Sequence, residues 1–155
     1  MTAAIVADGD YAACERLLVG GSRSFFWASL LLPAHLRRAS AALYAFCRQA
    51  DDAVDQGGGL EGLRDFQARL DDIYAGRAAT ATDRAFAQVV TEFHIPRELP
   101  DALLEGMAWD IEGRRYEDLS DLTAYATRVA GTVGAMMALL MGPRDAAALE
   151  RAVEL

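Results

Sequence analysis

Residues 47–55, CRQADDAVD, place three carboxylates and one arginine within a stretch that otherwise reads as an apolar helix. On a helix with about 100° per residue, one arc of roughly 100° collects the charged side chains and one aromatic ring of residues 41–55: Tyr44, Arg48, Asp51, Asp52 and Asp55. The other positions are mostly apolar, so we expect a largely buried helix with a single polar stripe. That stripe must face water, a partner or an internal cavity.

Asp51 and Asp55 lie one helical turn apart and could hold a divalent cation. At about 6 Å their carboxylates repel each other unless a cation sits between or beside them. Mg²⁺ prefers one or two protein carboxylates completed by water and phosphate oxygens, so the pair could form half of a diphosphate clamp, with Mn²⁺ as the alternative metal. Arg48, one turn earlier, could bind a phosphate oxygen. The alternative interpretation is an exposed acidic helix face, because this spacing also arises by chance.

The composition is that of one soluble domain and limits its partners. The chain has 155 residues, of which 53% are hydrophobic and 25% charged, so it can bury a core. The formal net charge of −8 argues against a general nucleic-acid-binding protein, which needs a basic surface to neutralise phosphates. An anionic ligand must therefore be met by local positive charge.

Cysteine usage and hydropathy suggest a reducing, aqueous environment. Cys14 and Cys47 form no CxxC pattern and predict neither a disulfide framework nor a zinc site. The N-terminal residues lack the charged start and apolar core of a secretory signal. The longest weakly polar run, residues 129–142, is shorter than the roughly 20 residues that span a bilayer. We expect a cytoplasmic protein that is soluble or peripheral to a membrane.

Gly and Pro divide the chain into segments of helical length, and no segment shows the period-2 alternation of a strand. The sequence therefore predicts an all-α protein, with residues 1–155 forming a single domain. The expected helices cover residues 10–19, 22–32, 34–55, 60–75, 82–94, 101–113, 119–141 and 144 onward. Asp10, Asp101 and Ser120 are the expected N-caps. The last segment stops at Leu155 without a cap, which leads us to expect a chain cut inside an element.

A second candidate surface lies in YATRVAGTVG, residues 125–134. Tyr125 and Val129 are one turn apart, and Gly131 and Gly134 remove side chains from the adjacent turn at a cost of about 1 kcal/mol each in helix propensity. Something is therefore expected to approach this face closely. Tight helix packing and an apolar ligand both explain the pattern, and both remain open.

The sequence resembles the phytoene/squalene synthase family, the trans-isoprenyl diphosphate synthases that join two prenyl diphosphates head to head. The resemblance runs from about Ser22 to Gly142 and rests on three motifs in the family's order: SRSFFWASLLLP, RRASAALYAFCRQADDAVD and GMAWDIEGRRYEDLSDLTAYATRVAGTVGAMM. Bacterial phytoene synthases are the most similar members. The resemblance implies an isoprenoid-synthase helical bundle around a central cavity, with two aspartate-rich motifs that bind Mg²⁺ and the diphosphates.

Carried over by position, the resemblance makes Asp51 and Asp55 the metal ligands, and it adds Arg48 and Tyr44 as catalytic residues. Further positions are implied near the substrate, either beside the diphosphate or along the cavity: Ser22, Ser24, Phe25, Tyr125, Val129 and Gly134. The family has an aspartate similar to Asp110, for which we expect either a cavity-facing role or a salt bridge with Arg114 or Arg115.

For an intact relative, the resemblance implies that two geranylgeranyl diphosphates condense to phytoene through a cyclopropyl diphosphate, in carotenoid biosynthesis. Metal and arginine would stabilise the leaving diphosphate, and an apolar cavity would protect the carbocation. One alternative is a squalene, dehydrosqualene or hydroxysqualene synthase that uses farnesyl diphosphate. Another is a non-catalytic assembly or interaction protein on the same scaffold. The apolar product suggests peripheral membrane contact, and nothing in the sequence indicates an oligomeric state.

The family's second acidic motif has no counterpart in this sequence. Glu117 and Asp121 have a similar spacing, but they stand at an expected helix start, where acids act as caps and favour the helix dipole. We therefore expect the N-terminal half of the fold, inactive on its own.

Overall fold

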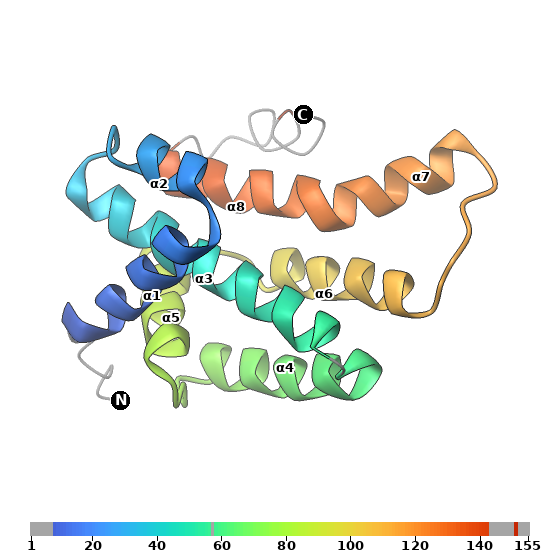
Figure 1. The fold of residues 1–155 in the computed structure, drawn as a ribbon, viewed down its shortest axis with the longest axis horizontal. Helices are drawn as coiled ribbons and strands as arrows, with labels where there is room; N and C mark the ends of the chain where they lie inside the picture. Colours follow the sequence, from blue (N-terminus) through green and yellow to red (C-terminus); the bar gives the residue numbers. More distant parts are fainter. Residues whose placement is uncertain (1–7, 57, 143–150, 152–155) are drawn as a thin grey trace. The chain divides into compact units, whose positions relative to one another are not determined.

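The structure is a computed structural model that describes residues 8–56, 58–142 and 151. Within these ranges every regular element is a helix, as the sequence predicts (Figure 1). The chain divides into two compact units, the first made of residues 1–50 and 68–94 and the second of residues 51–67 and 95–155. The single domain expected from the sequence stays a prediction.

The helices follow one another along the chain with short connections. The first unit holds α1 (Asp8–Gly21), α2 (Arg23–Ser29), most of α3 (Ala34–Asp55), the end of α4 (Gly59–Tyr74) and α5 (Ala81–Phe93). The second unit holds the end of α3, the start of α4, α6 (Glu98–Ile111), α7 (Leu119–Ala126), the π-helical turn η1 (Thr127–Gly131) and α8 (Thr132–Met141).

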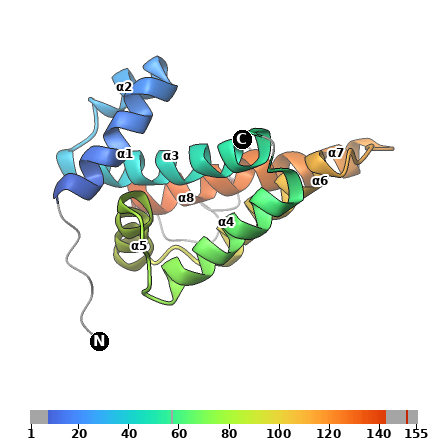
Figure 2. The same ribbon diagram turned by 60° about the horizontal axis from the view of Figure 1, so that its bottom comes forward.

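In the first unit α1 packs on α5, and α2 continues from α1 before the chain turns back into α3 (Figure 2). Phe46 of α3 stacks on Phe86 of α5, with ring centroids 4.3 Å apart and ring planes at 15°. Both rings are buried, as are Leu43 and Ala50 on the same side of α3. The apolar side of α3 that the sequence predicts is therefore confirmed as core.

In the second unit α6 packs along α7, η1 and α8, which join into one helix from Leu119 to Met141 (Figure 1). Gly106 of α6 permits the close approach, because a Cβ there would lie 2.7 Å from Val129 Cγ1 and 2.8 Å from Arg128 Cβ. The π-helical turn lies at this crossing, where its wider backbone accommodates one extra residue.

The joined helix has 23 residues and is long and apolar enough, by length and composition, to cross a membrane. The weakly polar run that begins at residue 129 is shorter than a membrane span, but its residues 129–141 form only the end of this longer helix, which the sequence predicts over residues 119–141. One such helix is weak evidence for a membrane span, since the core helix of a soluble protein passes the same test. One third of its apolar window is buried inside the structure.

The chain reverses between α3 and α4, as the QGGG segment predicts. Gly58 and Gly62 pack against the carbonyl oxygen of Ala53, and a Cβ on Gly58 would lie 2.5 Å from that oxygen. Gly59 has a φ of 49°, in the left-handed region that glycine adopts at little cost. These glycines allow the start of α4 to fold back onto the last turn of α3.

Two of the expected N-caps are wrong because each helix begins before the acid, which lies inside the first turn and forms an ion pair there. Asp10 lies inside the first turn of α1, is 5% exposed, and pairs with Arg84. Asp101 lies inside α6, which begins three residues earlier at Glu98, and its carboxylate accepts from Arg97 Nε at 3.1 Å. An acid in a first turn is favoured by the helix dipole without being the cap residue.

The third expected cap, Ser120, is also wrong, because Asp118 caps α7 and accepts a hydrogen bond from the Asp121 N–H at 2.9 Å. The helix-start role expected for Asp121 is confirmed, since it lies in the first turn of α7. The helix expected from residue 144 onward falls outside the described residues, apart from residue 151.

Candidate functional site

The last turns of α3 carry the residues predicted to bind metal and diphosphate. Arg48, Asp51 and Asp55 are exposed, while Tyr44 and Asp52 are half-buried. Because the opposite side of α3 is core, the predicted polar stripe is confirmed. Exposure of this kind is expected for a ligand site and for an acidic surface alike, so the metal-binding role of Asp51 and Asp55 stays a prediction.

The chemistry of Asp51 and Asp55 suits a hard divalent cation such as Mg²⁺, which binds carboxylate oxygens and keeps several water ligands. Within residues 8–56, 58–142 and 151, no group of three or more His, Cys, Asp or Glu side chains is placed to hold a metal ion. A Mg²⁺ ion on this pair would commonly keep water ligands or take diphosphate oxygens as its other ligands.

The start of α2 brings the predicted Ser22, Ser24 and Phe25 together with Tyr44. Ser22 is the N-cap of α2, and its Oγ accepts from the Phe25 N–H at 3.3 Å and lies 3.3 Å from Ser24 Oγ. The Phe25 ring meets the Tyr44 ring edge-on, with centroids 6.2 Å apart. A Cβ on Gly21 would lie 3.1 Å from Tyr44 Cζ, so the lack of a side chain at Gly21 leaves room for this ring at the end of α1.

In the second unit, Tyr125 of α7 donates its hydroxyl hydrogen bond to Asp110 Oδ2 of α6 at 2.6 Å. This bond, together with burial, raises the pKa of Tyr125 to about 12, because loss of the proton would place two negative oxygens side by side. The Tyr116 ring lies 5.0 Å from the Tyr125 ring. The bond between Tyr125 and Asp110 links α7 to α6, while the cavity-facing role of Asp110 stays a prediction.

Close helix packing explains part of the pattern in residues 125–134. Val129 of η1 packs against Gly106 of α6, so the helix-packing interpretation is confirmed for this residue. Gly131 is buried, and Gly134 is half-buried in the first turn of α8. A substrate-lining role for Tyr125, Val129 and Gly134 stays a prediction.

Two features of the structure were missed by the sequence analysis, and the first is an aromatic ring in contact with two guanidinium groups. Arg114 and Arg128 lie over the Trp109 ring, with Cζ 3.9 Å and 4.3 Å from its centroid. Arg128 also lies 3.1 Å from the Glu105 carboxylate. Since the two arginines come from different segments, no local spacing reveals that both contact this ring.

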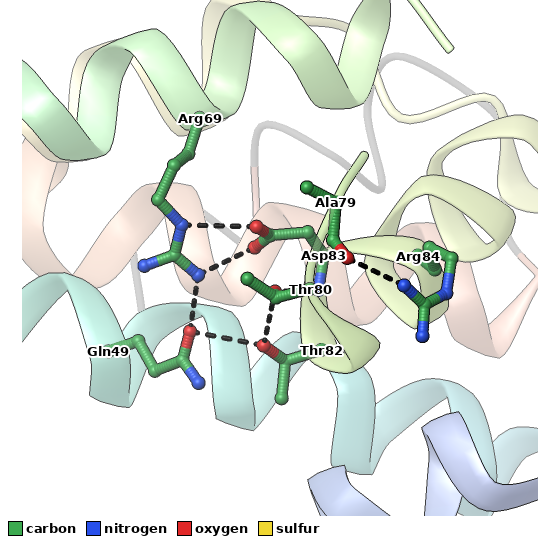
Figure 3. A network of polar contacts seen from close by, with 7 residues as sticks. All are labelled: Gln49, Arg69, Ala79, Thr80, Thr82, Asp83 and Arg84. Atoms are coloured by element: carbon green, nitrogen blue, oxygen red, sulfur yellow. Dashed lines mark hydrogen bonds and ion pairs between the residues drawn. The ribbon is translucent and has the colours of Figure 1, made fainter. Parts of the chain in front are cut away.

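The second is a polar network between helices of the first unit (Figure 3). Asp83, in the first turn of α5, is 5% exposed and binds the guanidinium of Arg69 from α4. The same guanidinium donates to Gln49 of α3. A signal existed in the sequence, because Asp83 lies three residues before the core residue Phe86 and therefore on the buried face of α5.

Comparison with known proteins places this chain in a family. The family model described as "Squalene/phytoene synthase" matches residues 18–155. The phytoene synthase of Rhodobacter capsulatus is 53% identical over 156 residues, which cover 97% of this chain and 46% of that protein. The phytoene synthase of Cereibacter sphaeroides is 49% identical, with coverages of 97% and 46%.

Solved structures agree with these matches. A squalene synthase HpnC from Alicyclobacillus acidocaldarius superposes with a TM-score of 0.86 at 30% identity, covering 94% of this chain and 56% of that one. A dehydrosqualene synthase in complex with ligand gives 0.80 at 33% identity, covering 85% and 47%. The chain thus spans about half the length of the curated relatives that it matches.

Proposed function

The chain belongs to the squalene/phytoene synthase family, and we propose that it forms the N-terminal half of a prenyltransferase that joins two prenyl diphosphates head to head. The observation that carries this proposal is the family match over residues 18–155, with a phytoene synthase 53% identical along nearly the whole chain. The proposed reaction converts two geranylgeranyl diphosphates to phytoene, for carotenoid biosynthesis.

In this proposal the α3 stripe handles the diphosphates. Asp51 and Asp55 hold Mg²⁺ or Mn²⁺, which supplies positive charge to a leaving diphosphate when bound. Arg48 donates to diphosphate oxygens. Tyr44 and Phe25 contribute aromatic faces to the proposed site. A desolvated cation over such a face gains on the order of 1–2 kcal/mol.

The proposed reaction has two steps. In the first, the allylic C–O bond of one substrate breaks, diphosphate leaves, and the double bond of the second substrate captures the cation, with loss of one proton, to form a cyclopropyl diphosphate. In the second, the remaining diphosphate leaves, and rearrangement with loss of another proton gives phytoene. Each diphosphate carries away the electron pair of the bond that it breaks.

The phytoene branch is preferred over synthesis of a shorter product for one reason. The relatives that are 53% and 49% identical are named phytoene synthases, whereas the squalene and dehydrosqualene synthase structures are 30% and 33% identical. Farnesyl diphosphate remains the alternative substrate. We place the enzyme in the cytoplasm, with peripheral membrane contact to deliver an apolar product.

A fusion protein tests the proposal: residues 1–155 of this chain joined to the remaining C-terminal part of the Rhodobacter capsulatus relative. Supplied with geranylgeranyl diphosphate and Mg²⁺, it should yield a C40 product by mass spectrometry, and none when EDTA removes the metal. The 155-residue chain alone should yield no product. A C30 product from farnesyl diphosphate alone would favour the alternative, and a folded fusion protein without either product would refute the proposal.

A further inference from the structure

Two buried carboxylates of the first unit each bind an arginine in a bidentate manner, and one of these pairs extends to α3. Arg69 of α4 donates from Nε to Asp83 Oδ2 at 3.0 Å and from Nη2 to Asp83 Oδ1 at 2.7 Å (Figure 3). The Asp83 side chain is 6% exposed. A bidentate contact to a buried carboxylate fixes the plane of the guanidinium group, so Arg69 is held in one orientation.

The oriented guanidinium of Arg69 also holds Gln49 of α3. Arg69 Nη2 donates to Gln49 Oε1 at 2.6 Å, and Thr82 of α5 donates from its hydroxyl to the same oxygen at 3.1 Å. The Thr82 hydroxyl lies 3.2 Å from that of Thr80, the N-cap of α5. One oxygen on α3 therefore receives donors from two other helices, and α3 cannot turn about its axis without breaking both bonds.

Gln49 lies at the border between the core side of α3 and its polar stripe. It directly follows Arg48, and on a helix its side chain is displaced by about 60° from that of Asp52. A rotation of α3 by about 20° would move a side-chain tip some 6 Å from the axis by about 2 Å. Displacements of about 1 Å in a catalytic group can cost about 100-fold in rate.

We propose that Gln49, Arg69 and Asp83 are positioning residues that fix the rotation of α3 and thereby the direction in which Arg48, Asp51 and Asp55 face. The proposal rests on the function proposed above for those three residues. It gives the buried Arg69–Asp83 ion pair a positioning role. Such a pair contributes little net stability, because the cost of desolvating two charges offsets much of their attraction.

The chain supplies a matched control in its second buried pair. Arg84 donates to Asp10 at 3.1 Å and 2.7 Å, with side-chain exposures of 33% and 7%, against 34% and 6% for Arg69 and Asp83. This second pair ties α5 to α1. Loss of either pair should lower the melting temperature similarly, but only loss of the Arg69 pair should release α3.

Hydrogen–deuterium exchange of the 155-residue chain, followed by mass spectrometry, tests the proposal directly. Peptides covering residues 48–56 report on the end of α3. Gln49→Met and Arg69→Met should each speed exchange there by about tenfold. Arg84→Met should change the exchange rate of these peptides by less than about twofold. Gln49→Glu keeps an acceptor oxygen toward Arg69, so exchange should stay as slow as in the unsubstituted chain. Gln49→Met leaves the Arg69–Asp83 pair intact, so it keeps the test valid if Arg69→Met does not fold.

Kinetics of the fusion protein give the second readout. Gln49→Met should lower kcat about 10- to 100-fold and change KM by less than about threefold, because misaligned groups still bind substrate. Unchanged exchange in Gln49→Met, or equal acceleration in Arg84→Met, would overturn the positioning role. A different outcome is that hydrogen exchange in the substituted chains changes as expected, but the unsubstituted fusion protein makes no product. That result would support the constraint on α3 and refute the proposed function instead.

Discussion

At the scale of single residues, the hydrogen bond from Tyr125 to Asp110 gives the protein a tyrosine that resists ionisation. The pKa of Tyr125 is raised from 10.0 to about 12, first by this bond and then by burial. Because the folded-state pKa lies above the unfolded value, the bond contributes its full stability below about pH 10. That contribution is lost as the pH rises through about 12.

Ultraviolet titration of tyrosinate measures this effect, and the difference between the unsubstituted chain and Tyr125→Phe isolates one of its five tyrosines. Asp110→Ala should return the titration of Tyr125 toward pH 10. Asp110→Asn keeps an acceptor oxygen but removes the charge, so the pKa should fall only part of the way. A Tyr125 that titrates near 10 in the unsubstituted chain would show that the bond does not form.

Replacing Asp51 tests the proposed metal binding most directly. Asp51→Asn in the fusion protein should lower the rate of product formation by about 10²–10³-fold, since a neutral amide holds a divalent cation poorly. The side chain is exposed, so the melting temperature should stay within about 2 °C. Asp65→Asn, another exposed acid outside the predicted stripe, is the control and should keep normal activity. A near-normal rate in Asp51→Asn would assign metal binding to other residues.

At the scale of elements, helix positions followed from the sequence to within a few residues, because Gly and Pro punctuate it and the apolar periodicity is strong. Residues 34–55 were predicted as a helix and form α3 with those bounds. Caps were predicted poorly, because α1 and α6 begin before Asp10 and Asp101, which lie inside the first turns of these helices. The link from Gln49 to Arg69 joins residues 20 positions apart and depends on how three helices pack.

The close crossing of α6 with η1 depends on Gly106, which has no side chain. Gly106→Ala should lower the free energy of unfolding by about 1–3 kcal/mol, because the added methyl group meets Val129 and Arg128 at less than 3 Å. Gly20→Ala in α1 is the matched control, since its Cβ would meet no atom within 4 Å. That change should raise the free energy of unfolding by about 0.5–1 kcal/mol through helix propensity. Urea titration followed by circular dichroism compares the two, and a neutral Gly106→Ala would mean that the helices can separate.

At the scale of the whole molecule, the sequence identified the family and the all-α fold, but it placed the candidate site only in part. A helical stripe can be read from spacing alone, which is why Arg48, Asp51 and Asp55 could be grouped on α3. The partners of Tyr125 and of Asp83 could not be predicted from spacing, because each partner lies on another helix and the contact depends on tertiary packing. Local periodicity therefore predicts which side of a helix is polar, and not what that side meets.

Ligand-dependent stability of the fusion protein distinguishes an enzyme from a non-catalytic scaffold. A ligand at about 100 times its Kd adds about 2.7 kcal/mol to the free energy of unfolding when it binds only the folded state. Mg²⁺ with a non-hydrolysable prenyl diphosphate analogue should therefore raise the melting temperature by several degrees. Neither component alone should do so, because cation and diphosphate complete each other's coordination at Asp51 and Asp55. A scaffold without the site would melt at the same temperature under all conditions, and Asp51→Asn should behave as that scaffold does.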